Sequence, residues 1–305
     1  MKIRENIPNA ITAGNLFCGC VAVVFAFRGD LMISSLFVAL AAFLDFFDGF
    51  FARLLKVSSP IGKDLDSLAD MVSFGLVPGI TVFHLMYFSI IQTKAGNLPL
   101  DFSKQYSTDG VSFFFSSWEI ILPYCAFLIT VFSALRLAKF NNDVRQSDSF
   151  IGLPTPANAI FIMGIPVFLS STFGFDNFDF AVNPLFYSKQ EFNSLMLSKS
   201  VGMILSEPQI GSIEKFSLIL LSSKWFYLFL TITSSYFLVS EIPMISLKFK
   251  KLSWKGNEIR WILIAFSVLS LLLIGFSSFS LIILIYLLIS LFWNLSKINQ
   301  PKPLE

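Results

Sequence analysis

Long apolar stretches, each close to the length of a membrane-spanning helix, follow one another along most of this chain. A helix needs roughly 20 predominantly apolar residues to cross the hydrocarbon core of a bilayer. Eight segments meet that requirement, at residues 9–27, 32–55, 64–90, 118–139, 153–174, 224–246, 258–276 and 278–296. The pattern therefore predicts an all-α fold, a polytopic bundle of about eight transmembrane helices.

The connections between the apolar stretches differ in length. Only Ser277 and Ser278 separate the last two apolar stretches, which predicts a tight helical hairpin at about 258–296. The other stretches form a core at about residues 5–246, and a single membrane domain over residues 1–305 is the simplest description. Two longer segments mix Phe, Ser, Asp and Lys without strong periodicity and receive no chemical role: 92–117 and 175–223.

The composition agrees with a membrane protein. Hydrophobic residues make up 55% of the chain and charged residues only 14%, too few polar residues to cover a soluble domain of this size. The net charge of +2 includes no dense basic run, so no nucleic acid is expected as a partner. The three cysteines lie in apolar stretches without the spacing of a metal site or a disulfide framework: Cys18, Cys20 and Cys125.

The basic residues orient the bundle. Short cytoplasmic loops of membrane proteins carry an excess of Lys and Arg. If both termini lie on one side, that side collects 15 of the 22 basic residues. Both termini are therefore expected in the cytoplasm, which is consistent with an even number of spans.

Acidic residues interrupt the second apolar stretch in a regular pattern. Asp45, Asp48, Gly49 and Ala52 are spaced i, i+3, i+4 and i+7, so a helix places them on one stripe. Arg53 lies at the edge of this stripe. The stripe thus carries two carboxylates followed by two residues small enough to admit a ligand or another backbone.

The third stretch repeats this pattern after a short turn. Gly62, Asp66 and Asp70 lie four residues apart and share one helix face. Because the connection is short, the two helices are predicted to be antiparallel neighbours. Four carboxylates then converge between them, near the cytoplasmic ends.

Carboxylates in this position need a compensating charge. Each Asp near the centre of a membrane helix costs roughly 2.5–3.5 kcal/mol, and crowded carboxylates repel one another. Pairing with Arg53, Lys56 and Lys63 would account for one or two of them. Four acids on facing stripes instead indicate bound hard divalent cations, Mg²⁺ or Mn²⁺. Four Asp side chains are enough to bind two such ions. Two-metal sites favour phosphoryl-type displacement.

The same residues resemble the signature of the CDP-alcohol phosphatidyltransferase family. Eight residues over 26 positions agree with that signature: Asp45-x2-Asp48-Gly49-x2-Ala52-Arg53-x8-Gly62-x3-Asp66-x3-Asp70. The resemblance implies a helical membrane core of that family. It also implies two divalent ions that hold the pyrophosphate of a CDP-lipid.

Roles for individual residues follow from this resemblance by position. The metal ligands would be Asp45, Asp48, Asp66 and Asp70. Asp70 would also be the general base that takes the proton of the acceptor hydroxyl. The residues bordering the CDP group would be Gly49, Ala52, Arg53 and Gly62. No Ser, Cys or His is placed as a covalent nucleophile, which favours direct displacement.

Further segments resemble the serine-using branch of this family. They are Ile7-Pro8-Asn9, Thr12, residues 15–19, 66–75, 136–141, 152–156 and 240–243. The resemblance implies CDP-diacylglycerol and L-serine as substrates, with phosphatidylserine and CMP as products. It also implies a homodimer among the lipids of a bacterial cytoplasmic (inner) membrane.

A serine acceptor carries a carboxylate, so its pocket needs a cation. Arg136 and Lys139 are candidates at the cytoplasmic end of the fourth span, and Asn141 and Thr155 are candidates for hydrogen bonds. Lys139 occupies a position where the serine-using branch is expected to have Arg, so the bidentate guanidinium is missing there. Basic residues at this position also serve as membrane anchors, and that alternative stays open.

Other functions remain possible at this point. The same reaction with glycerol 3-phosphate or inositol phosphate as acceptor would need more clustered cations than Arg136 and Lys139 provide. A cation transporter would use the Asp cluster as an ion path, but it predicts polar groups through the whole depth of the membrane. A lipid-binding or scaffold protein would tolerate loss of Asp70.

Overall fold

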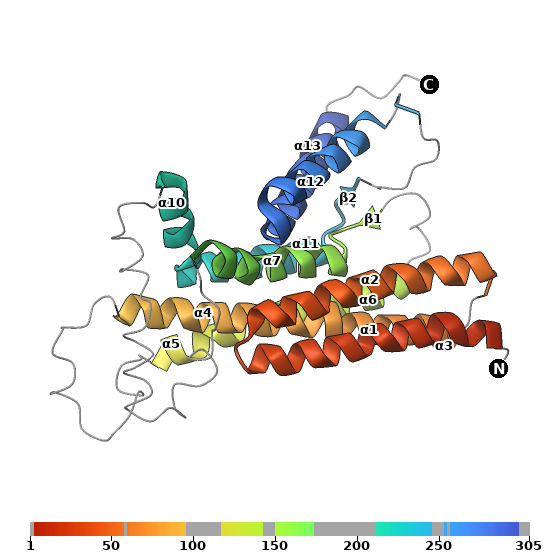
Figure 1. Cartoon of the computed structure of the whole chain (residues 1–305), viewed down its shortest axis with the longest axis horizontal. Helices are drawn as coiled ribbons and strands as arrows, with labels where there is room; N and C mark the ends of the chain where they lie inside the picture. The colour runs from red at the N-terminus through yellow and green to blue at the C-terminus, as the bar shows by residue number, and fades with distance from the viewer. Residues whose placement is uncertain are drawn as a thin grey trace.

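The computed structural model describes residues 3–57, 60–95, 117–142, 150–173, 211–245, 253–254 and 257–298. Long helices lie side by side in a bundle, and α12 and α13 project from it (Figure 1). The first half contains α1 (Ile3–Phe27), α2 (Leu31–Leu55), α3 (Pro60–Asp70), the π-helical turn η1 (Met71–Leu76), α4 (Val77–Ala95), α5 (Ser117–Ile121), the 3-10 turn η4 (Leu122–Ala126) and α6 (Phe127–Asn142). The second half contains β1 (Phe150–Ile151), α7 (Thr155–Phe173), α10 (Ser212–Leu221), α11 (Lys224–Val239), β2 (Pro243–Met244), α12 (Glu258–Ile274), the 3-10 turn η6 (Gly275–Ser278) and α13 (Phe279–Ile298).

The structure confirms the helical membrane fold, and it supports fewer spans than the eight predicted. Five of the predicted spans are helices long and apolar enough to cross a bilayer: Asn6–Phe27, Leu31–Leu55, Ile61–Ile90, Trp118–Asn142 and Thr155–Phe173. The helices α10 and α11 reach that length only together, across a bend of 71°. Helix α12 has 17 residues, and the apolar part of α13 is Phe279–Trp293. The described residues thus contain five spans, or six if the bent pair is one span.

The third predicted span is not a regular helix, because a π-helical turn follows Asp70 directly. Two glycines let α6 approach this region closely. A Cβ atom on Gly79 would lie 2.3 Å from Thr130 Oγ1, and one on Gly75 would lie 3.1 Å from Ser133 Cβ. Thr130 Oγ1 also donates a hydrogen bond to the carbonyl oxygen of Gly75 at 3.1 Å. Small residues at helix contacts in membranes allow such backbone proximity.

A short antiparallel ladder joins two distant connections of the bundle, which the all-α prediction did not include. Strand β1 pairs with β2 so that Phe150 faces Met244 and Ile151 faces Pro243. Gly152 continues the contact with a φ of 73°, and its N–H donates to the Ile242 carbonyl at 2.8 Å. Helix α11 therefore ends at Val239 rather than at the predicted residue 246.

The C-terminal hairpin docks on α7 through small residues. A Cβ atom on Gly164 would lie 2.3 Å from Ser280 Oγ, so only glycine fits at this contact. Ser280 Oγ donates to the Phe161 carbonyl at 2.6 Å, and the hydroxyls of Ser171 and Ser277 lie 2.5 Å apart.

Residues 96–116 and 174–210, which make up most of the two segments without an assigned role, lie outside the described residues.

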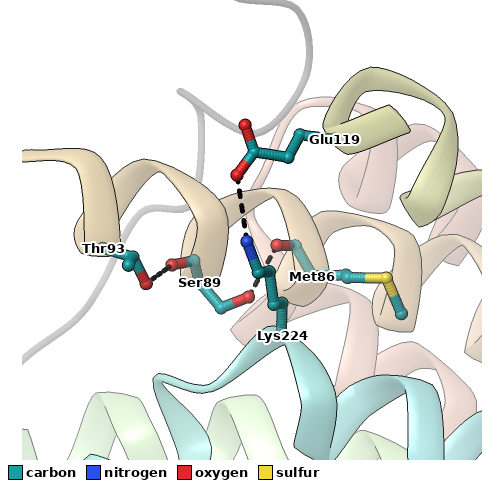
Figure 2. Close-up of polar contacts among 5 residues, drawn as sticks. All are labelled: Met86, Ser89, Thr93, Glu119 and Lys224. Atoms are coloured by element: carbon teal, nitrogen blue, oxygen red, sulfur yellow. Dashed lines mark hydrogen bonds and ion pairs between the residues drawn. The ribbon is translucent and has the colours of Figure 1, made fainter. Parts of the chain in front are cut away.

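One buried ion pair ties α5 to the start of α11. Lys224 Nζ lies 2.9 Å from Glu119 Oε1, and the two side chains are 14% and 4% exposed. Figure 2 shows Lys224 reaching past α4 to meet Glu119. The ammonium also lies 4.4 Å from the centroid of the Trp118 ring, which stacks with Trp225 at 6.3 Å. We call this group the Glu119–Lys224 clamp; α5 and the α10–α11 junction lie at the end of the bundle away from α3 (Figure 1).

Candidate active site

Acidic side chains from α2 and α3 meet at one end of the bundle. Asp45, Asp48 and Asp66 each offer a carboxylate oxygen, and these oxygens all lie within 4.8 Å of one another. Asp48 is buried, whereas Asp45 and Asp66 are partly exposed. The helix stripes predicted from the spacing thus face each other, because the turn between α2 and α3 is short.

Asp70 lies beside this group at the end of α3. It is 8% exposed and is not one of the three clustered residues, but it interacts electrostatically with Asp45 and Asp66, and more weakly with Asp48. The prediction of four converging carboxylates therefore corresponds to three clustered acids and a fourth neighbour. We call Asp45, Asp48, Asp66 and Asp70 the acid site.

The basic residues near the acid site do not neutralise it. Arg53 Nε donates to the Gly49 carbonyl at 2.9 Å, within α2. Lys63 Nζ donates to the Asn141 carbonyl at 2.6 Å, which links α3 to the end of α6. Among the described residues, no lysine or arginine forms an ion pair with an acid-site carboxylate. The alternative in which these acids only pair with local cations is thus not supported.

A cavity of about 240 Å³ opens beside the acids. Three of the four residues expected to border a CDP group line it: Gly49, Ala52 and Gly62. The fourth, Arg53, is exposed and bonded along its own helix. A Cβ atom on Gly49 would meet nothing within 4 Å, so this face of α2 borders open space. The cavity is lined as well by Pro8, Asn9, Thr12, Asp48, Val57, Lys63 and Asp66.

Helix α1 forms a third wall that sequence reasoning did not assign to the site. Thr12 Oγ1 lies 2.7 Å from Asp48 Oδ2, and Asn15 Nδ2 donates to Asp70 Oδ1 at 3.3 Å. Both residues are buried. Their spacing with Pro8 and Gly19 (8, 12, 15, 19) places them on one helix stripe. That stripe was the available signal, but nothing in the sequence indicated which helix it would face.

The four acceptor candidates have different surroundings. Arg136 is buried, and its Nη1 donates to the Leu238 carbonyl at 3.2 Å. Lys139 is exposed, and Thr155 is buried at the start of α7. Asn141 Nδ2 donates to Ser67 Oγ at 2.8 Å, so Asn141 joins the end of α6 to α3. None of the four lines the cavity beside the acids.

Comparison with known proteins decides the family of this chain. The profile of the CDP-alcohol phosphatidyltransferase family matches residues 5–187, more than half of the sequence. The chain belongs to the CDP-alcohol phosphatidyltransferase family. The match contains the acid site and the α1 stripe, and α12 and α13 lie outside it.

Individual CDP-alcohol phosphatidyltransferases resemble about half of the chain. A Bacillus subtilis protein named CDP-diacylglycerol–serine O-phosphatidyltransferase is 31% identical over 150 residues, covering 49% of this chain and 69% of the relative. Relatives of the same name from Helicobacter pylori and Saccharomyces cerevisiae are 31% and 29% identical, covering 51% and 60% of this chain. The chain spans only 55% and 61% of the lengths of these two relatives.

Proposed function

We propose that this protein transfers the phosphatidyl group of CDP-diacylglycerol to L-serine, forming phosphatidylserine and CMP. The observation that carries the proposal is the acid site beside a cavity lined by Gly49, Ala52 and Gly62. Carboxylates in an apolar helix bundle are costly and mark function. Family membership and the names of the relatives support the same chemistry.

The cavity is the proposed site of the CDP group. The small residues Gly49, Ala52 and Gly62 leave room for it, and Lys63 at the same cavity supplies a positive charge for phosphate oxygens. The outer side of α2 next to the site is apolar, with Phe46 and Phe50 exposed. A lipid substrate would therefore reach the cavity sideways from the bilayer, with its head group at the acids.

The acid site fits divalent metal ions. Oxygen ligands suit Mg²⁺ or Mn²⁺, and three carboxylates within 4.8 Å of one another have no cationic partner among the described side chains. We propose that Asp45, Asp48, Asp66 and Asp70 hold two such ions. When bound, the ions supply charge stabilisation for the pyrophosphate and for the oxygens of an in-line displacement.

Asp70 is the proposed general base. It takes the proton of the serine hydroxyl as the serine oxygen attacks the phosphorus that bears diacylglycerol. A bond forms between that oxygen and phosphorus, the bond from phosphorus to the oxygen of CMP breaks, and CMP leaves with the electron pair. No Ser, Cys or His is among the residues lining the described cavity, and Thr12 Oγ1 is engaged with Asp48. Direct displacement accounts for the transfer without a covalent enzyme intermediate.

The proposed acceptor pocket lies at the end of α6. Arg136 and Lys139 remain the cations proposed for the serine carboxylate, and Asn141 and Thr155 the residues proposed to form hydrogen bonds with serine. Asn141 forms hydrogen bonds with Lys63 and Ser67, so the end of α6 lies next to α3. Glycerol 3-phosphate and inositol phosphate are the alternative acceptors. The proposed setting is a bacterial cytoplasmic membrane, with a homodimer whose termini face the cytoplasm.

The test uses purified protein in detergent with CDP-diacylglycerol and Mg²⁺ or Mn²⁺. CMP release is measured with L-serine, glycerol 3-phosphate or inositol phosphate supplied singly, beside an Asp70→Asn variant. Release that requires metal and serine, and that is lost in the variant, supports the proposal. Release only with a phosphorylated acceptor overturns the choice of serine. Absence of release with all three, from folded protein, favours a cation transporter or a scaffold.

A further inference from the structure

A hydrogen-bonded chain runs from the π-helical turn through α1 to Asp70. Ser73 Oγ lies 2.7 Å from Asn15 Oδ1, and Asn15 Nδ2 lies 3.3 Å from Asp70 Oδ1. Ser73 and Asn15 are both completely buried. Asp70 and Ser73 belong to the same chain segment, so Asn15 of α1 bridges two positions on either side of the α3–η1 junction.

Helices α1 and η1 lie so close together that no side chain fits at Gly19. A Cβ atom on Gly19 would lie 2.3 Å from Ser73 Oγ and 3.1 Å from Ser73 Cα. Gly19 follows Asn15 by one helical turn and therefore sets the distance at which Asn15 meets η1. π-Helical turns inside helices are rare and frequently lie at functional sites.

The chemistry of the chain fixes the orientation of the Asn15 amide. Ser73 has one hydroxyl proton, and its short contact is with Asn15 Oδ1, whereas the Asn15 backbone oxygen is farther away at 3.2 Å. The Asp70 carboxylate can only accept, so the amide presents its NH₂ group to Asp70 and its oxygen to the Ser73 hydroxyl. The amide N–H thereby holds one of the two carboxylate oxygens of Asp70.

We propose that Ser73 and Asn15 are positioning residues for Asp70. This inference rests on the proposed function, in which Asp70 is the general base. Asn15 holds Oδ1, so Oδ2 remains the oxygen that receives the acceptor proton. Ser73 acts one step further away, because its hydroxyl donates to Asn15 Oδ1 and holds the amide in the rotamer that reaches Asp70. Neither residue lines the cavity where the CDP group is proposed.

Ser73→Ala is the decisive variant, because it removes only the hydroxyl. Ser34→Ala is its matched control, since Ser34 is equally buried and its hydroxyl bonds only the Ala22 carbonyl, at 2.9 Å. We expect kcat for CMP release to fall by about 10- to 100-fold in Ser73→Ala, the range for groups that orient a ligand or base. KM for CDP-diacylglycerol is expected to stay unchanged, and Ser34→Ala is expected to match the parent protein.

A double variant tests whether Ser73 acts through Asn15. If it does, Asn15→Ala with Ser73→Ala has the kcat of Asn15→Ala alone, because the two losses are not independent. Additive losses would overturn the proposal. So would a Ser73→Ala variant whose kcat equals that of Ser34→Ala at the same unfolding temperature. If Asn15→Ala does not fold, the comparison of the two serine variants decides alone.

An infrared measurement separates this inference from the proposed function. In metal-free protein, the carboxyl band of Asp70 is the one that disappears in Asp70→Asn. We expect that band to shift in Ser73→Ala and to stay in place in Ser34→Ala, whatever the acceptor of the reaction is. An unshifted band in Ser73→Ala means that Ser73 does not control Asp70. A shifted band together with no CMP release from the parent protein would overturn the proposed function and leave the Ser73–Asn15–Asp70 connection standing.

Discussion

The two ends of the bundle use charge in opposite ways. At the clamp, the carboxylate of Glu119 meets the ammonium of Lys224, which also lies over the ring of Trp118. At the acid site, four carboxylates lie together with no ion-pair partner among the described residues. Neutral donors, Thr12 and Asn15, contact two of them instead.

This difference separates a structural use of charge from a functional one. A buried pair of opposite charges joins two helices and needs no ligand (Figure 2). A cluster of like charges in an apolar bundle is unfavourable until a cation binds. Substitutions in the clamp should therefore lower stability and leave the reaction rate unchanged. Substitutions in the acid site should lower the reaction rate, and removal of a carboxylate there should not lower stability.

The largest contrast is expected from Asp70→Asn. Loss of a general base lowers rates by roughly 10²–10⁴-fold, so CMP release should fall by that amount. The unfolding temperature of the metal-free protein should stay equal or rise, because one of several crowded negative charges is removed. Thermal unfolding and CMP release measured on the same preparation test both parts. A marked loss of stability would contradict the contrast between the two ends.

The converse change is Lys224→Met at the clamp. It leaves Glu119 buried without its ammonium, which typically costs about 3–5 kcal/mol. Activity per folded molecule should remain that of the parent protein. The double variant Lys224→Met with Glu119→Leu is the control, and it should recover most of the lost stability, since no unpaired charge remains. Denaturation curves of the three proteins provide the measurement, and a double variant as unstable as Lys224→Met would show that the charge is not responsible.

Thr12→Val addresses the neutral donors of the acid site. The substitution keeps the shape of the side chain and removes the hydroxyl that contacts Asp48. Because Thr12 orients a proposed ligand, metal affinity should weaken by about 10- to 100-fold. Titration of metal-free protein with Mn²⁺, followed by its thermal shift, reports this affinity. Thr81→Val, whose hydroxyl contacts only Met163 Sδ at 3.2 Å, is the matched control and should titrate like the parent protein.

The smallest effect is expected from Gly49→Ala. The added methyl group meets no protein atom within 4 Å, and alanine stabilises a helix interior by about 0.5–1 kcal/mol relative to glycine. The methyl group does enter the cavity, so KM for CDP-diacylglycerol should rise by about tenfold. Gly79→Ala makes the opposite test: it clashes with Thr130 and should lower stability. An unchanged KM in Gly49→Ala would argue against the CDP group at this cavity.

Local spacing predicted the acid site well and long-range contacts poorly. The i, i+3, i+4, i+7 stripe of Asp45 and its partners depends only on helix geometry, and the short turn brought α3 alongside. Three clustered carboxylates followed from these two facts. The roles of Thr12 and Asn15 did not, because a polar stripe on an apolar helix does not show which neighbouring helix it will face.

Other features depended on contacts that no sequence pattern records. The Glu119–Lys224 pair joins residues 105 positions apart. The β1–β2 ladder has only two residues per strand, and β2 lies within the predicted apolar span 224–246. Arg136 is a proposed acceptor residue, and its hydrogen bond to the Leu238 carbonyl depends on where α11 ends.

The acid site, its hydrogen-bond donors Thr12 and Asn15, and Ser73 all belong to α1, α2, α3 and η1, which end at Leu76. The clamp needs Lys224, which is synthesised much later. Because chains emerge from the ribosome N-terminus first, the parts of the acid site enter the membrane together and early. We expect the carboxylates to face one another, and to need protons or cations, while most of the bundle is still being made. The Glu119–Lys224 ion pair then forms at a late stage of assembly.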